Sequence, residues 1–257
     1  MESLVALIGQ NNVMLFLLLF ARISGLFAFF PFFSHANIPI SLKTAITLFM
    51  VIFLYPLVPS IDVDVGLLSL SLAVVTELMI GFVAGLFLSI LFAILQLAGM
   101  QISTVMGFTM ASVIDPQTST SIPLVSQFLS LIGLMVILAV NGHHQMLLFI
   151  SESLSLLPLG SFYPQTNIVV YLGQAMTGMF VYGFILSFPV LAFSLLMDVV
   201  FGMIMKTMPQ FNLMVVGFPI KIAVSFVVLV TILASMMLIF KKEFFEVMNH
   251  MTLLFAP

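Results

Sequence analysis

Long apolar blocks follow one another along almost the whole chain, separated by short polar interruptions. They cover roughly residues 13–33, 44–60, 66–100, 122–158, 168–197 and 213–240. A helix needs about 20 consecutive apolar residues to cross the hydrocarbon core of a bilayer, and it satisfies its backbone hydrogen bonds internally. The pattern therefore predicts an all-α, polytopic membrane protein.

Several of these blocks are too long for one crossing. Block 66–100 would reach about 50 Å as a straight helix and block 168–197 about 45 Å, whereas the hydrocarbon core is about 30 Å thick. Pro189 predicts a kink in the second of these helices. Tilting absorbs a modest excess, so six ordinary tilted spans are the alternative. The repeated excess favours long, kinked helices that leave the bilayer and pack on other protein.

Block 122–158 is interrupted by the sequence Asn141-Gly142-His143-His144. Asn-Gly is a strong turn signal, and it divides the block into helices of about 18 and 14 residues, each short for a full crossing. We therefore expect a short helical hairpin. The two histidines point in different directions on any regular element, and no cysteine or acidic neighbour completes a metal shell. We expect turn and helix-capping histidines and no metal site.

Composition agrees with the membrane class. Hydrophobic residues make up 63% of the 257 residues and charged residues only 6%, whereas soluble domains carry about 25% charged residues. Lipid or other protein must therefore cover most of the chain. The few charges form no basic patch, which argues against nucleic-acid binding. The absence of cysteine excludes disulfides, thiolate metal sites and cysteine nucleophiles.

Glu77, Gly81 and Gly85 recur every four residues and therefore share one helix face. Small residues allow another helix to approach closely, and a buried glutamate then needs a hydrogen-bond partner. This face predicts a subunit-packing seam with a polar latch. The alternative is that the glycines only reflect how common glycine is in membrane helices.

Arg22 is the single charge in its block and lies near the middle of it. An arginine at mid-membrane costs at least about 2.5–3.5 kcal/mol, so we expect an acidic or carbonyl partner in this chain or a neighbouring one. The alternative is that the helix lies partly outside lipid and Arg22 meets water. Asp198, Lys206 and Lys221 lie around a bend expected near residues 199–212. We interpret them as charges at an interface or between subunits, and not as a proton relay.

The stretch Leu97–Pro123 is a polar-flecked interruption that contains no Lys or Arg. Its centre, Met106–Pro116, reads MGFTMASVIDP and combines small, flexible and apolar residues. A loop this apolar is a poor solvent-facing linker and is better suited to the lumen of a pore. Glycine at 107 supplies backbone freedom, and the Asp-Pro pair at 115–116 ends the loop rigidly.

Three stretches carry a resemblance to a known family. They read ARISGLFAFFPFFSHANIPISLKTA from residue 21, ELMIGFVAGLFLSILFAILQLAGMQISTVMGFTMASVIDPQ from residue 77, and NGHH from residue 141. In this order they resemble the FliR family of flagellar export-gate subunits, whose injectisome counterpart is called SctT. The later stretch LLMDVVFGMIMKTMPQFNLMVVGFPIKIAVSF is similar to the small gate subunit FliQ.

The resemblance implies a FliP-like part over residues 1–165, with a plug loop at about 100–121, and a FliQ-like helical hairpin over 166–257. One such chain would close a helical export-gate assembly of FliP and FliQ homologues and would contact FlhB and the export motor FlhA. The assembly would lie among lipid in the bacterial inner membrane, at the flagellar basal body, and protrude toward the periplasm. It would conduct unfolded flagellar export substrates. The resemblance implies neither an enzyme nor a cofactor.

In this family the central loop is held in the constriction of the pore. Carried over to this chain, the plug residues are Met106, Gly107, Phe108, Met110, Val113, Ile114, Asp115 and Pro116. Apolar constrictions seal by dewetting, and methionine repacks around varied surfaces. An ordinary packed connecting loop is the alternative.

Two other functions stay open at this point. The first is the injectisome version of the same subunit, which exports virulence effectors. The second is a secondary transporter for a small solute. That class needs broken helices in matching halves, and the breaks offered by Pro189 and Pro219 have no matching pair in the first half of the chain.

Overall fold

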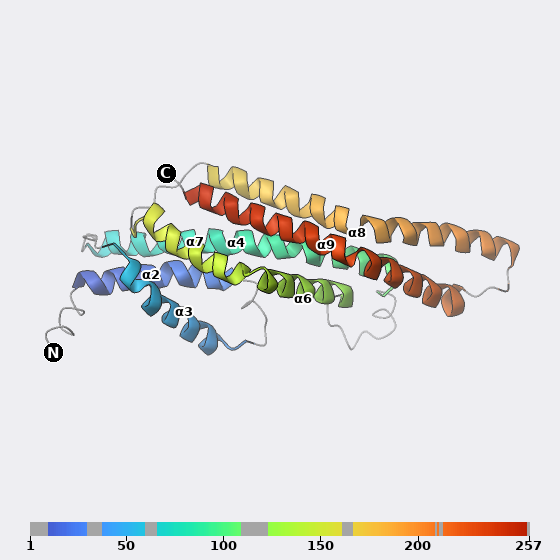
Figure 1. Ribbon diagram of the computed structural model, residues 1–257, viewed down its shortest axis with the longest axis horizontal. Coiled ribbons are helices and arrows are strands. Elements are labelled where there is room, and N and C mark those ends of the chain that lie inside the picture. The colour runs from blue at the N-terminus through green and yellow to red at the C-terminus, as the bar shows by residue number, and fades with distance from the viewer. Residues whose placement is uncertain are drawn as a thin grey trace. The chain divides into compact units, whose positions relative to one another are not determined.

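Helices account for nearly all of the described part of the chain. The computed structural model (Figure 1) describes residues 10–29, 38–59, 66–108, 123–160, 167–208, 210 and 213–255. Its elements are α2 (Gln10–Phe29), α3 (Ile40–Leu54), the 3₁₀ turn η1 (Tyr55–Leu57), α4 (Leu67–Met106), α6 (Leu124–Ala139), α7 (Gly142–Leu156), α8 (Asn167–Thr207), the π-helical turn η3 (Leu213–Gly217) and α9 (Phe218–Phe255). Every regular element within these ranges is a helix, which confirms the all-α prediction.

Five helices of the described ranges are long and apolar enough to cross a membrane, or six if the broken pair α6 and α7 counts as one span. The longest are α4 with 40 residues, α8 with 41 and α9 with 38. At about 1.5 Å per residue each is about 60 Å long, twice the thickness of a hydrocarbon core of about 30 Å. The expectation of helices that exceed a bilayer is confirmed.

Two predicted boundaries are wrong. The plug loop is expected from about residue 100, but α4 continues to Met106. The Thr104 hydroxyl donates to the Met100 carbonyl of its own helix, and Gln101 accepts the hydroxyl of Ser187 in α8. The bend expected at 199–212 begins later, since α8 continues to Thr207. Pro189 lies inside α8 and does not end the helix.

The described turn between α6 and α7 agrees with the sequence. Asn141 adopts a left-handed backbone conformation with φ of 57°, which asparagine tolerates better than most residues because its short polar side chain bonds locally. Helix α7 then begins at Gly142. The predicted Asn-Gly break is therefore confirmed, with helices of 16 and 15 residues on its two sides. The expected hairpin is wrong, because the chain bends by 68° at the break and does not turn back antiparallel.

The chain divides into two compact units. Unit 1 comprises residues 1–90, 141–175 and 245–257, and unit 2 comprises residues 91–140 and 176–244. Helices α4, α8 and α9 each contribute to both units. The units group residues that pack together, whereas the FliP-like part at 1–165 and the FliQ-like part at 166–257 are continuous stretches expected from the resemblance. Those two parts stay a prediction.

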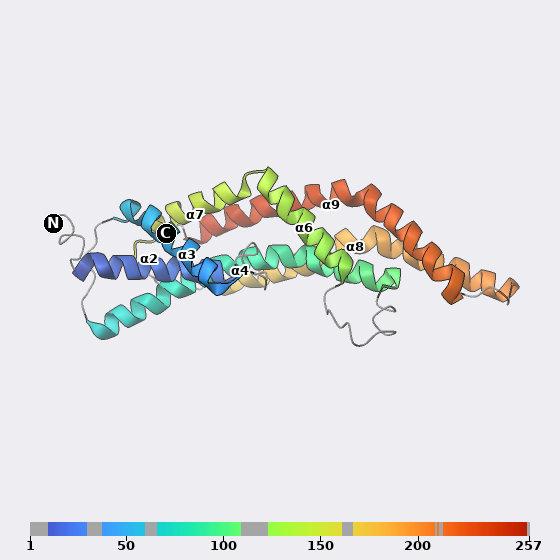
Figure 2. The ribbon, with the colours of Figure 1, turned by 90° about the horizontal axis from the view of Figure 1, so that it is seen from below.

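In unit 1, α2 lies parallel to the first half of α4, and both views show the two helices together (Figures 1 and 2). Glycines permit this approach. A Cβ on Gly25 would overlap the main chain of Leu78 and Phe82, and one on Gly85 would lie 2.6 Å from the Leu26 carbonyl oxygen. A T-shaped pair of rings, Phe29 and Phe82 with centroids 4.5 Å apart, closes the contact.

In unit 2, the second half of α4 packs against three helices. It lies antiparallel to α6, where Gly99 meets Ser126 and Gly133 meets Leu95. It lies parallel to α8, where a Cβ on Gly183 would be 2.7 Å from Leu97. It also contacts α9. The contacts with α6 and α8 therefore use glycines, and the contact with α9 pairs the rings of Phe92 and Phe240.

The units leave much apolar surface uncovered. Within the apolar window of α4, 56% of the residues are buried, against 28% for α8 and 22% for α9. The exposed large side chains of α8 include three phenylalanines at four-residue spacing, Phe180, Phe184 and Phe188. Lipid or another protein must cover these faces.

The closest helix contact of unit 2 gives a stability prediction. A Cβ at Gly99 would overlap Ser126 Cα and lie 2.7 Å from the Ser126 nitrogen, so Gly99→Ala should force α4 and α6 apart and cost about 1–3 kcal/mol. Gly202→Ala is the matched control, because no atom lies within 4 Å of its Cβ. Alanine there should be neutral or stabilise the helix by up to about 1 kcal/mol. Thermal unfolding of the full chain in detergent measures both, and equal unfolding temperatures would contradict the packing assignment.

Candidate functional site

A buried ion pair lies at the centre of unit 1. Arg22 of α2 is 3% exposed and Glu77 of α4 is fully buried. Arg22 Nε donates to Glu77 Oε2 at 2.5 Å, and Arg22 Nη2 donates to Glu77 Oε1 at 3.1 Å. Two parallel bonds of this kind make a forked arginine–carboxylate pair, the most directional ion pair that protein side chains form.

The remaining partners come from the end of α7. Arg22 Nη1 donates to the Ser153 carbonyl at 3.1 Å, and Nη2 also donates to the Leu157 carbonyl at 3.0 Å. The amide of Gly160 donates to Glu77 Oε1 at 2.8 Å. The expected acidic or carbonyl partner of Arg22 is therefore found, and both kinds are present within this chain.

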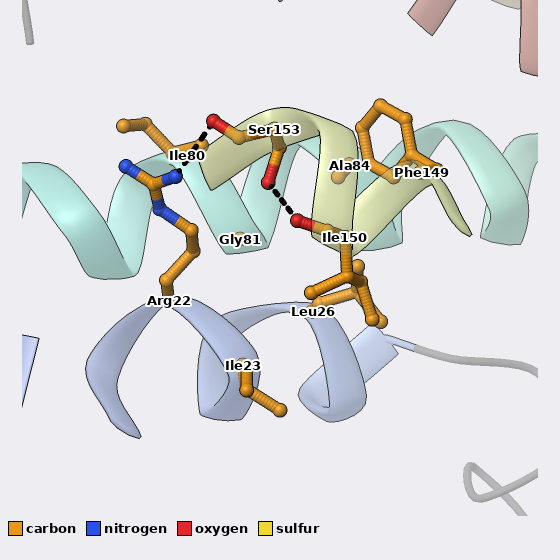
Figure 3. Close-up of a pocket in the computed structure, with 9 residues that line it drawn as sticks. All are labelled: Arg22, Ile23, Leu26, Ile80, Gly81, Ala84, Phe149, Ile150 and Ser153. Carbon is orange, nitrogen blue, oxygen red and sulfur yellow. Dashed lines mark hydrogen bonds between the residues drawn. The ribbon is translucent and has the colours of Figure 1, made fainter. Parts of the chain in front are cut away.

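Three separate segments meet around Arg22, as the close-up shows (Figure 3). Arg22 extends from α2 toward the end of α7, where the Ser153 carbonyl receives its hydrogen bond, and Gly81 of α4 lies behind it. The small cavity beside the guanidinium is otherwise lined by apolar side chains, including Leu26 and Phe149. An unpaired charge here would have no water to solvate it, so the pair and the carbonyls together make burial of the arginine tolerable.

The glycine face predicted on α4 is filled from within the chain. A Cβ on Gly81 would overlap the Arg22 carbonyl oxygen and lie 2.8 Å from the Leu26 nitrogen. Glu77, Gly81 and Gly85 therefore admit α2 of the same chain. A contact between subunits, predicted for these residues, would have to use other faces of the helices and stays a prediction.

A second ion pair joins α8 to α9 in unit 2. Lys221 Nζ donates to Asp198 Oδ1 at 2.7 Å and to Oδ2 at 2.8 Å. The lysine side chain is 8% exposed and the aspartate side chain 52%. The Asp198 carboxylate is therefore about half exposed, and it pairs with the largely buried ammonium of Lys221.

Other polar residues singled out from the sequence lie apart from both pairs. Lys206 is exposed in the last turn of α8, where a cation is favoured by the helix dipole. His143 and His144 are exposed at the start of α7. Among the residues that the structure describes, no three His, Asp or Glu side chains gather closely enough to hold a metal ion.

The described start of the predicted plug is a helix end. Met106 is fully buried as the last residue of α4. Gly107 has φ of 91°, its amide donates to the Thr104 carbonyl, and the Phe108 amide donates to the Ser103 carbonyl. This pair of bonds around a left-handed glycine is the Schellman cap, so Gly107 terminates α4.

The rest of the predicted plug, Met110, Val113, Ile114, Asp115 and Pro116, lies outside the described residues. Sequence reasoning did not identify the partners that the structure adds: the carbonyls of Ser153 and Leu157 and the amide of Gly160. Main-chain partners carry no side-chain signal, so no motif could have revealed them. Left-handed glycine is a common helix end, and this signal could have placed the end of α4 at Gly107.

Comparison with known proteins gives a consistent result. Residues 13–247 match the family described as "Bacterial export proteins, family 1". The flagellar biosynthetic protein FliR of Bacillus subtilis (strain 168) is 33% identical over 235 residues, covering 89% of this chain and 90% of that relative. FliR of Caulobacter vibrioides is 26% identical over 237 residues, covering 91% and 94%. FliR of Escherichia coli (strain K12) is 25% identical over 217 residues, covering 84% and 81%.

The buried pair predicts strong coupling between two positions 55 residues apart in sequence. Arg22→Met and Glu77→Met should each cost about 3–5 kcal/mol, because each leaves an uncompensated buried charge. The double variant should lose clearly less unfolding free energy than the two single variants lose together, although the Gly160 amide then lacks its acceptor. A double-mutant cycle on unfolding in detergent measures this coupling.

Lys206→Met is the matched control for that cycle. It also removes a long cation, but from an exposed position at the end of α8, and should cost less than about 1 kcal/mol. Strict additivity of the Arg22 and Glu77 variants would contradict the pairing.

Proposed function

The chain belongs to family 1 of the bacterial export proteins, and on that basis we propose that it is a membrane subunit of the flagellar export gate. The single observation that carries the proposal is the match over residues 13–247 together with relatives named as flagellar biosynthetic protein FliR. Those names favour the flagellar apparatus over the injectisome. They also favour a part of an export machine over a secondary transporter for a small solute.

We propose that FliP and FliQ homologues are the neighbours that cover this chain. The uncovered apolar faces of α8 and α9 support this, because helices about 60 Å long extend beyond what lipid can cover. In this proposal one copy of the chain closes the helical assembly, and FlhB and FlhA contact the completed gate. The FliQ-like hairpin at 166–257 supplies the face toward the small subunit.

The proposed activity is the passage of unfolded flagellar proteins across the bacterial inner membrane. The chain acts as conduit and plug, with energy supplied elsewhere in the apparatus, and performs no catalysis. The assembled gate lies at the flagellar basal body and protrudes toward the periplasm. The segment that follows Gly107 seals the pore, because its apolar residues exclude water until a substrate displaces them.

Assembly is tested by co-purification. A tagged FliP homologue, co-produced with a FliQ homologue and this chain in bacterial membranes, should retain the chain through detergent extraction and size exclusion. A neighbour is needed because so much apolar surface of α8 and α9 is uncovered. A lone chain that stays monodisperse and does not bind the tagged complex would contradict the proposal.

The seal is tested by a deletion that spares the helix end. Removing residues 109–114 leaves Gly107 and its cap in place, so α4 should fold and the complex should assemble. Small ions should then leak through membranes that contain the variant gate, measured as collapse of an imposed ion gradient. Ser71→Ala is the control, because the exposed Ser71 hydroxyl bonds to the Leu68 carbonyl of its own helix. Tight membranes around a normally assembled variant gate would show that this segment is not the seal.

A further inference from the structure

The structure assigns a positioning role to Ser194 of α8 and Phe218 of α9. We infer that these two residues hold the C-terminal end of α4 and so set the direction in which the chain leaves it toward the segment proposed as the plug. The inference rests on the proposed function for its consequence, but the attachment itself is a property of unit 2.

The first attachment completes the hydrogen bonding of the end of α4. The last four carbonyls of a helix lack partners within it. Here the Ser103 and Thr104 carbonyls accept the amides of the cap, and the Val105 carbonyl accepts the Ser194 hydroxyl at 3.0 Å. Ser194 is fully buried. The Ser194 hydroxyl of α8 therefore satisfies the Val105 carbonyl, which has no partner within α4.

The second attachment is steric. A Cβ built on Gly107 would lie 3.2 Å from Cδ1 of Phe218 and 3.5 Å from Cε1. The Phe218 ring thus lies against the glycine that turns the chain out of α4. Phe218 is the first residue of α9, directly after the π-helical turn Leu213–Gly217, and such turns are frequent at functional sites.

A third contact sets the register one turn earlier. The Ser187 hydroxyl donates to Gln101 Oε1 at 2.6 Å. Together the contacts at Gln101, Val105 and Gly107 follow the last two turns of α4 on the side of α8 and α9. They fix the end of the helix in position and in rotation about its axis.

One substitution can weaken the attachment. The fully buried Met106 packs the final turn beside one neutral hydrogen bond and one ring contact, and a neutral hydrogen bond has a small net effect. The buried hydroxyls of Ser103 in α4 and Ser225 in α9 have no hydrogen-bond partner among the described residues. An unsatisfied buried hydroxyl costs stability in the packed arrangement. Removing the Ser194 hydroxyl should therefore let the end of α4 separate from α8 and α9 more often.

A single thiol reports this release. The chain contains no cysteine, and Ser103 is fully buried in the last turn of α4 with a hydroxyl that has no partner to lose. Ser103→Cys is therefore a conservative reporter. The full chain is co-produced with FliP and FliQ homologues, and maleimide labelling of the thiol is followed in membranes. Ser194→Ala should increase the labelling rate about five-fold, the equivalent of one neutral hydrogen bond.

Matched variants separate local release from general loosening. Phe218→Leu should accelerate labelling in the same direction and serves if Ser194→Ala fails to assemble. Ser71→Ala should leave the rate unchanged, because the exposed Ser71 hydroxyl bonds only to the Leu68 carbonyl of its own helix. A second reporter, Ala84→Cys, is buried in unit 1 and should label at the parent rate in every background.

The labelling rates decide whether Ser194 and Phe218 hold the end of α4. Faster labelling at position 103 alone supports the attachment. Equal rates in the Ser194→Ala and Ser71→Ala backgrounds, including no labelling in either, would overturn it. An equal increase at positions 103 and 84 would also overturn it, because the variant then loosens the whole chain. The two proposals can also be separated. If labelling increases at position 103 alone but membranes with the 109–114 deletion do not leak ions, the attachment is supported and the plug is rejected.

Discussion

The forked pair between Arg22 and Glu77 is the interaction on which unit 1 depends. It joins α2 to α4, and its outer hydrogen bonds reach the end of α7 and the turn after it. In an apolar protein these charges are tolerated because they satisfy each other and are joined by main-chain groups. Glycines at 25, 81 and 85 bring the helices close enough for the fork to form. The ion pair and the glycine contacts therefore depend on the same close approach of α2 and α4.

The chain combines an interior in which Arg22 pairs with Glu77 and Lys221 pairs with Asp198 with an exterior that leaves much apolar surface uncovered. The interior contains the ion pair of α2 and α4 and the hydrogen bonds that end α4. The exterior contains the long faces of α8 and α9, which exceed a bilayer in length. A chain of this kind is suited to an assembly in which neighbours surround it, and membership of the bacterial export family agrees with that role.

The sequence predicted the helical class, the break at Asn141 and the shared face of Glu77 and Gly81, because each follows from apolarity, turn chemistry or helical spacing. It also predicted that Arg22 needs a partner. It could not identify Glu77 as that partner, since 55 residues separate them. The last turns of α4 looked like loop because Gln101 and Ser103 are polar, but these side chains point inward. The partners of the end of α4 come from α8 and α9, far along the sequence.

The central claim is that the buried charges of Arg22 and Glu77 are satisfied within this chain. An experimental map of the assembled gate that resolves the Arg22 side chain tests this most directly. Our account predicts that the guanidinium forks onto Glu77 of the same chain, with the carbonyls of Ser153 and Leu157 beside it. A guanidinium that instead pairs with a carboxylate of a neighbouring subunit would contradict it.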